Sequence, residues 1–524
     1  MDGPAMLQRS LGLQADRYSR YIGPTTSFEL LLMKPSTIDL QDESLLPRGI
    51  LRQVGDRDTF LTLPDHGTAG FGHILRDADA VEDVVGPYGR NLIDLYFEIV
   101  HPAFPIMEKQ IFLEKYDRSH RECSPPLLAA VYILAIGWWE HDGDLLHVPR
   151  PDVEELERLA RRTFEDAVTR PRLSTVQAGL LLSQRPEGGE WPPTAQLIAV
   201  GQELGLHLDC SGWKIPQWER GLRSRLAWAL YMQDKWGALV HGRPSHISAS
   251  DWDVRALTLN DFAAVEWDEG DVVERQDVEQ GRLLFVHAVQ LSEILTEILE
   301  TFFTLRSANA ISEAGLQSAQ LVLSMAKPVQ LKLRDWYRGL PVELRLPSAS
   351  SGYSPPPTPT SGLSSVGYLH LAYFATEMTL HRQIIRSLAS NASTAEPHVH
   401  QICRNAARAR LISAMEFVNR LTPSHLQSFW YFASKTNFAL VATFGSLLLA
   451  TSSGREEADW YRRRLREYRW TLSVSAKSRG STALTEFAMT TLDIFKEQLK
   501  QLPEKPSMSW RVGSGGHVST SGDL

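Results

Sequence analysis

The stretch ERGLRSRLAWALYMQDKWGALVHGRPSHISASDWDV, residues 219–254, decides the fold prediction. When residues 219–240 are drawn as a helix, one side gathers Leu222, Leu226, Ala229, Leu230, Gln233, Trp236, Gly237 and Val240. Trp228, Met232 and Leu239 widen this apolar arc past half of the circumference. Because a helix that is apolar over such a width must be covered on most sides, the stretch predicts an interior helix of a large helical domain.

Most of the remaining sequence has the same helical period. The chain has 524 residues, of which 43% are hydrophobic, and no convincing alternating strands, so we predict an all-α fold with little sheet. The Ser/Pro/Gly-rich stretch SASSGYSPPPTPTSGLSS, residues 348–365, separates two helical halves. The predicted parts are a loosely structured arm over 1–88, a first helical half over 89–346, a linker over 347–366, a second helical half over 367–502 and a disordered tail over 503–524.

Charge and cysteine content restrict the function classes. The formal net charge of −8 gives no chain-wide basic field that would draw the protein onto nucleic acid. The three cysteines, Cys123, Cys210 and Cys403, are too dispersed for a disulfide framework, which favours a reducing intracellular compartment. The longest apolar runs, 127–139 and 438–450, are shorter than the roughly 20 residues of a membrane helix, so we expect them to be buried helices.

Polar residues crowd the end of the 219–254 stretch, and they raise the question of a metal site. Imidazole and carboxylate groups bind zinc or manganese, and the candidates are His241, His246, Asp251 and Asp253. They follow a Gly-Arg-Pro turn, however, instead of standing one helical turn apart as in HExxH, and the second candidate, HLDC over 207–210, lacks a fourth ligand nearby. A stand-alone metal-dependent enzyme that uses residues 241–253 is therefore the alternative hypothesis.

A structural role is the favoured interpretation of these polar residues. Asp234 lies at the edge of the apolar arc, where an unpaired carboxylate would be costly, so it needs a donor. Arg243 is one candidate, and the backbone N–H groups of the turn built by Gly242 and Pro244 are the other. The sequence contains neither a GxSxG motif nor a Gly-rich phosphate loop, so we expect no catalytic residue.

Two further segments leave alternatives open. A regular apolar series fits either an internal helix or a dimerising coiled coil; its members are Leu284, Leu291, Leu295, Ile298 and Phe302, together with Ala288 and Leu305. The basic stretch WYRRRLREYRW, residues 460–470, fits a solvated helix face, but it is also typical of phosphate contacts or nuclear import.

Several motifs in order resemble the middle homology region of the fungal-specific transcription factors, which usually accompanies a binuclear zinc-cluster DNA-binding module. They are LIDLYFEIVHPAFPIMEKQIF, TVQAGLLLS, AQLIAVGQELGLHLD, the 219–254 stretch, LRDWYRGLPVEL and LHLAYFATEMTLHRQII, and they span about 89 to 450. The resemblance implies that eight residues form the structural signature of a regulatory domain: Arg225, Trp228, Asp234, Gly242, Arg243, Pro244, Asp251 and Asp253.

The zinc cluster itself needs six closely spaced cysteines, which this chain does not have. We therefore expect no DNA-binding residues, metal or cofactor in this chain, with zinc only if an upstream cysteine cluster exists. Either such a module lies upstream, or the protein reaches DNA through partners.

The resemblance also implies a role. The motifs YFEIVHPAFPI, FLEKY and SPPLLAAVYILA are similar to the broad co-activators of nitrogen-source catabolism. This implies a nuclear, non-enzymatic regulator of transcription in nitrogen or secondary metabolism. Its expected partners are other transcription factors or co-regulators, with a homodimer and a small metabolite effector as further possibilities.

Overall fold

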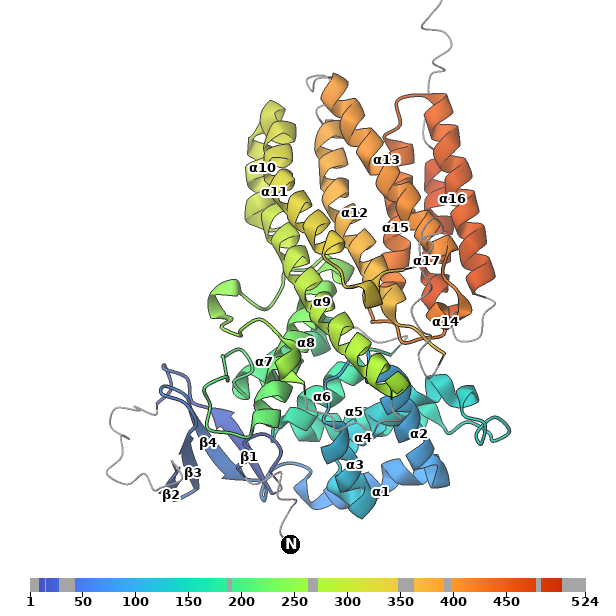
Figure 1. Ribbon diagram of the computed structural model, residues 1–524. Helices are drawn as coiled ribbons and strands as arrows, with labels where there is room; N and C mark the ends of the chain where they lie inside the picture. Colours follow the sequence, from blue (N-terminus) through green and yellow to red (C-terminus); the bar gives the residue numbers. More distant parts are fainter. Residues whose placement is uncertain are drawn as a thin grey trace, which may run out of the picture. The chain divides into compact units, whose positions relative to one another are not determined.

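The computed structural model describes residues 9–14, 16–27, 43–185, 191–262, 272–346, 362–390, 397–476 and 482–501 (Figure 1). Most of these residues are helical, which confirms the predicted helical fold class. The chain divides into two compact units, each assembled from several segments. The first contains Met1–Thr296, Gly339–Leu369 and Ser428–Ala433, and the second contains Glu297–Arg338, His370–Gln427 and Ser434–Leu524. These units differ from the two predicted halves, because each draws on both sides of the Ser/Pro/Gly stretch.

The first unit opens with an antiparallel sheet, which the sequence did not predict. Its strands are β1 (Arg17–Tyr21), β2 (Glu43–Leu46), β3 (Gly49–Gln53) and β4 (Thr59–Pro64), in the spatial order β1-β4-β3-β2. The prediction of a loosely structured arm over 1–88 is therefore wrong for the described residues. The strands are four to six residues long, so their alternation is too short to stand out from the surrounding Gly, Pro and Asp.

Helices make up most of the rest of the first unit. They are α1 (Ile74–Val85), α2 (Gly89–Leu95), α3 (Lys109–Arg118), α4 (Pro125–Ala135), α5 (Val153–Val168), α6 (Leu173–Leu182), α7 (Trp191–Glu203) and α8 (Gln217–His241). Every residue of α4 is buried, and α5 and α6 pack against it. Its two prolines stand in the first turn, where the missing N–H groups cost no helical hydrogen bond.

The second unit, considered by itself, is built from helices in the residues described. α9 (Val272–Phe302) and α12 (Val366–Ser390) begin in the first unit, and the others are α10 (Leu305–Glu313), α11 (Ser318–Arg338), α13 (Pro397–Asn419), α14 (Pro423–Leu426), α15 (Ser434–Ala450), α16 (Arg455–Ser475) and α17 (Thr482–Leu499). α15 packs so closely on α16 that a Cβ at Gly445 would lie 2.8 Å from a Leu465 methyl group. The Tyr468 hydroxyl donates to Phe438 O at 3.0 Å and ties the same two helices together.

The apolar series on α9 belongs to the interior of the chain. Five side chains have exposed fractions of 2% or less: Leu284, Leu291, Leu295, Ile298 and Phe302. They are covered within one copy of the chain, which favours the interpretation as an internal helix over the dimerising coiled coil. Leu305, the last member of the series, is 82% exposed and begins α10.

Two predicted segments fall largely outside the described residues. Of the predicted linker only 362–366 is described, and the predicted tail, 503–524, is not described at all. Within the described ranges, no helix combines the length and the apolar character needed to cross a membrane.

Candidate functional site

Arg225 on α8 holds a turn of the chain that precedes α3. Its guanidinium Nη1 donates to Pro105 O at 2.6 Å, and Nη2 pairs with the Glu108 carboxylate. Both side chains are nearly covered, with exposed fractions of 3% and 10%. Burial raises the pKa of Glu108, although the positive charge of Arg225 acts in the opposite direction. Arg225 therefore links α8 to this turn through buried hydrogen bonds and does not act as a surface charge.

The same turn carries His101, a partly buried histidine that stays neutral. Its Nε2–H donates to Met107 O at 3.1 Å. Burial lowers the pKa of His101 from 6.5 to about 3, and the cations of Arg225 and Lys109 add to this effect. A neutral imidazole with a backbone acceptor fixes the geometry of the turn without adding a buried charge.

Trp228 and Asp234 hold the chain that follows α8. The indole Nε1–H of Trp228 donates to Arg255 O at 2.9 Å. Asp234 has a fully buried side chain, and its carboxylate accepts from the backbone N–H groups of His246 and Ile247, both at 3.0 Å. The Ser245 hydroxyl adds a bond of 2.5 Å. The buried Lys235 ammonium lies 3.7 Å from the same carboxylate, so hydrogen-bond donors and a nearby cation together satisfy this buried charge.

Gly242 explains how the chain turns back toward Asp234. It has φ 62° and ψ 42°, a left-handed conformation that caps α8 and favours glycine, and its N–H donates to Ala238 O. The exposed Arg243 lies near its own backbone at His241 O and makes no described bond to Asp234, so the prediction of Arg243 as the partner is wrong. The backbone donors to Asp234 lie two to three residues beyond Pro244 instead of within the turn.

Some supporting residues were missed because no sequence signal links them. Lys235 donates to Ser245 Oγ at 2.6 Å and to Ile247 O at 2.7 Å. At the other end of α8, Glu219 accepts from the backbone N–H groups of Leu11 and Gly12, both at 2.9 Å. The last two bonds join residues more than 200 positions apart, which no local pattern reveals.

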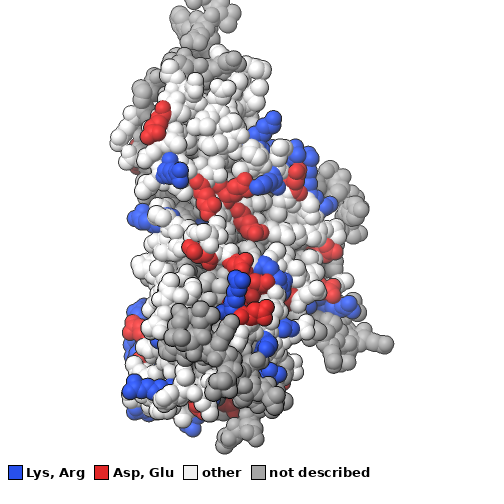
Figure 2. Space-filling view, turned by 90° about the vertical axis from the view of Figure 1, so that its left-hand side faces the viewer, with Lys and Arg blue, Asp and Glu red and all other residues white. Residues whose placement is uncertain are grey.

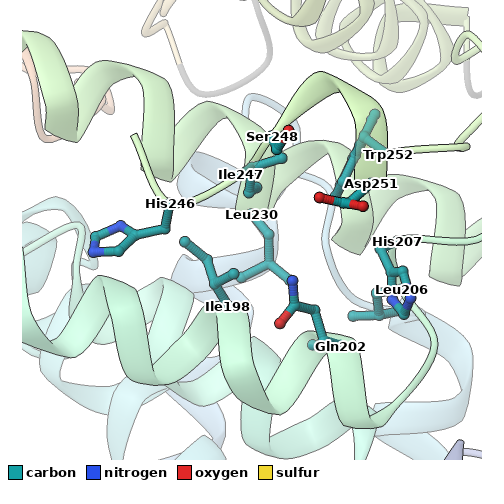
Figure 3. Close-up of a pocket in the computed structure, with 11 residues that line it drawn as sticks. Ile198, Gln202, Leu206, His207, Leu230, His246, Ile247, Ser248, Asp251 and Trp252 are labelled. Atoms are coloured by element: carbon teal, nitrogen blue, oxygen red, sulfur yellow. The ribbon is translucent and has the colours of Figure 1, made fainter. Parts of the chain in front are cut away.

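A pocket opens beside α8, between α7 and the segment that Asp234 holds (Figure 3). Its volume is about 390 Å³, part of which is open to solvent. The lining residues are Ile198, Gly201, Gln202, Leu206, His207, Leu230, His246, Ile247, Ser248, Asp251 and Trp252. All of them belong to the first unit. Of the eight signature residues, Asp251 alone lines this pocket, while the exposed Asp253 lies outside it and its N–H donates to His207 O at 2.9 Å.

In the part of the chain that the structure describes, two polar atoms at the pocket have no hydrogen-bond partner. They are Nδ1 of His207 and Nε1 of Trp252, and both atoms are buried. Burial lowers the pKa of His207, with the nearby negative charge of Asp251 opposing the shift. His246 turns its ring elsewhere: it stacks on Trp191 at a centroid distance of 4.3 Å and bonds the Asp234 carboxylate.

The metal hypothesis finds no support in this geometry. Among the described residues, no group of three or more His, Cys, Asp or Glu side chains is placed to hold a metal ion. The four candidate ligands do not converge, because His246 is used by Asp234 and Asp253 lies outside the pocket that Asp251 lines.

The basic stretch 460–470 lies on α16, and several of its arginines are paired with acids on the surface. Arg462 bonds Asp459 at 2.6 Å, and Arg464 bonds Glu467 at 2.9 Å. Figure 2 views the left-hand side of Figure 1, away from α16, and there Lys and Arg are interspersed with Asp and Glu. A solvated helix face is therefore the better description of this stretch than a phosphate-binding surface.

Comparison with known proteins identifies relatives of this chain. The family model described as "Fungal specific transcription factor domain" matches residues 93–338. The transcriptional activator protein DAL81 of Saccharomyces cerevisiae is 39% identical over 502 residues, which cover 89% of this chain and 50% of that protein. The acetamidase regulatory protein of Aspergillus oryzae is 28% identical, with coverage of 72% and 46%. The cutinase transcription factor 1 alpha of Fusarium vanettenii is 27% identical, with coverage of 48% and 27%.

The chain thus spans half or less of the length of each of these three relatives. No solved structure matches it. The matched region, 93–338, includes the turn held by Arg225, the whole of α8 and the pocket.

Proposed function

Because residues 93–338 form a domain of the fungal-specific transcription factor family, we propose that this chain regulates transcription of a fungal metabolic or biosynthetic pathway from the nucleus. The observation that carries the proposal is the match over nearly the whole chain to a protein named as a transcriptional activator. The names of the other two relatives, an acetamidase regulator and a cutinase transcription factor, support the metabolic setting.

In this proposal the chain acts through other transcription factors or co-regulators and has no catalytic role. Its three cysteines cannot form a six-cysteine zinc cluster, so DNA contact is supplied by a partner or by a module outside this sequence. The bonding of α8 supports a scaffold role, because its buried Arg225, Trp228 and Asp234 side chains all bind the backbone of neighbouring segments. The pocket beside α8 would hold a small metabolite effector.

Deletion and re-expression in the fungus test this proposal. We expect deletion of the gene to change the transcripts of a coherent set of metabolic genes, and the natural full-length protein to be recovered at their promoters by chromatin immunoprecipitation. If the transcripts are unchanged and no promoter is recovered, the proposal is wrong.

A second experiment tests the source of DNA contact. The purified chain, residues 1–524, is titrated onto promoter DNA at several salt concentrations. We expect only weak, salt-sensitive binding without sequence preference. Tight and sequence-specific binding by this chain would overturn the assignment of DNA contact to a partner or another module.

A further inference from the structure

The pocket beside α8 has one polar end and one apolar floor. Figure 3 shows the Asp251 carboxylate, the Gln202 amide and the His207 ring around one end, with Ile198 and Leu230 beside them. The His246 ring points away from the cavity at the other end. A ligand that fills this space therefore places a polar head group against the polar side chains and an apolar part, its body, against the aliphatic side chains.

The charge of the lining residues determines whether the head group of a bound ligand is a cation or an anion. The lining includes no Lys or Arg, and Asp251 is its one carboxylate. Asp251 is exposed, and within the described part of the chain its carboxylate accepts one long bond, of 3.3 Å from Ser250, so most of its acceptor capacity is not used there. An anion placed there would face a negative charge without a compensating cation, whereas a cation would gain a charge-assisted hydrogen bond.

Hydrogen bonding narrows the choice from any cation to one with several N–H donors. A carboxylate has only acceptors, the Gln202 amide offers a carbonyl oxygen, and a neutral imidazole offers one acceptor nitrogen. Among the described residues His207 Nδ1 has no hydrogen-bond partner, so its bonding capacity is not used within the chain. A primary ammonium group carries three N–H donors on one centre and matches these three side chains.

We propose that this pocket binds a small organic cation that has a primary ammonium group and a short aliphatic body. The ammonium group lies against Asp251, Gln202 and His207, and the aliphatic body covers Ile198 and Leu230. This inference deepens the proposed function by naming the chemical class of its effector, and its regulatory meaning rests on that function. The binding itself is independent of transcription and is tested on the purified protein.

Binding is measured through the indole N–H of Trp252, which lines the pocket and has no acceptor of its own. The protein is labelled with ¹⁵N-tryptophan, and the resonance is assigned from its loss in Trp252→Phe. Titration with n-butylammonium chloride should shift this resonance with a Kd on the order of 1 mM, as expected for so few non-hydrogen atoms. Potassium butyrate and 1-butanol at equal ionic strength should leave it unchanged. Equal shifts with butyrate or butanol would overturn the proposal.

A homologous series tests the apolar floor without any mutation. From methylammonium to butylammonium, each added methylene should tighten binding by about threefold to fourfold, because it buries aliphatic surface. Affinity that does not depend on chain length would contradict the placement of the body against Ile198 and Leu230.

Two matched substitutions test the head group. Asp251→Asn should weaken butylammonium binding about tenfold or more, because it removes the charge from the key acceptor. Asp253→Asn removes an equal charge two residues away, outside the pocket, and should leave Kd unchanged. The other tryptophan resonances report whether each variant is folded. Equal Kd values for the two variants would refute the role of Asp251.

A last comparison separates this inference from the proposed function. If Asp251→Asn loses binding and also loses regulation in the fungus, the cation is an effector. If binding is absent in the purified wild-type protein while promoter recovery and transcript changes persist, the ligand inference fails and the regulatory function stands.

Discussion

On α8 two of the three arginines are buried, whereas on α16 the arginines lie on the surface. Arg223 and Arg225 have exposed fractions of 2% each, and each bonds both a backbone carbonyl and a carboxylate. On α16, Arg469 is about half exposed and bonds Asp493 of α17 at 2.7 Å. Because water screens exposed pairs and cannot reach buried ones, the same residue type should contribute very differently to stability in the two helices.

The largest effect is expected for Arg225→Met. The substitution leaves Glu108 and Pro105 O buried without their donor, so the free energy of unfolding should fall by about 3–5 kcal/mol. The measurement is urea unfolding of the whole chain, followed by tryptophan fluorescence, so that variants in either unit are compared on the same scale. Arg463→Ala, at an exposed position of α16, is the matched control and should stay within about 0.5 kcal/mol of wild type. If both variants lose the same free energy of unfolding, the arginines of α8 and α16 do not differ in their contribution to stability.

Asp234→Asn should have the next largest effect. The amide keeps the size of the side chain but loses the charge that draws in the His246 and Ile247 N–H groups, so we expect a loss of about 2–3 kcal/mol. Asp253→Asn changes an exposed aspartate nearby and should be close to neutral. If Asp234→Asn has the melting temperature of the wild type, the attachment of the following segment to α8 does not depend on the charge of Asp234.

Acid should weaken the buried turn near α8. The pKa of His101 is about 3 in the folded protein against 6.5 when exposed, so the unfolded chain takes up the proton first. The contribution of His101 is therefore complete above pH 6.5 and is lost as the pH falls toward 3. From pH 7 to pH 5 the loss should be about 2 kcal/mol. His101→Gln, which retains a donor for Met107 O, should show a smaller fall over that range.

The smallest effect is expected for Arg469→Ala on α16. The surface pair with Asp493 should contribute about 0.5 kcal/mol, and less at high salt. The Arg469 hydrogen bonds lower the pKa of Asp493, so this contribution is present at neutral pH and is lost as acid protonates the carboxyl group. A loss above about 2 kcal/mol would show that α16 depends on its charges much as α8 does.

The helical fold was predictable where apolar residues repeat over many turns. The run that became α4 is buried at every position, as its composition indicates, and the α8 arc is buried as far as Gly237. The sheet escaped prediction because β2 and β3 have only four and five residues. Periodicity is a statistical signal, and so few residues cannot carry it.

The candidate site was predictable only in part, because much of it depends on contacts distant in sequence. Because a buried charge without a donor is costly, the sequence correctly predicts that Asp234 has one. The left-handed conformation of Gly242 directs the chain so that the donors lie beyond the turn. The sequence places His207 and Asp251 in two separate candidate metal sites. Their meeting at one pocket follows from the path of the backbone, in which Asp253 N–H bonds His207 O.

The bonding of α8 also has an evolutionary consequence. Arg225, Trp228 and Lys235 donate to backbone carbonyls, and Asp234 accepts from backbone N–H groups. Each of these four residues thus binds the backbone of the neighbouring segment, and three of them also bind a side chain there, Glu108 or Ser245. Mutations elsewhere in those segments should be able to accumulate by neutral drift as long as the path of the backbone persists, while the four helix residues should change only together with their surroundings. Divergent regulators could therefore acquire new surfaces and pockets around α8 while keeping one and the same interior helix.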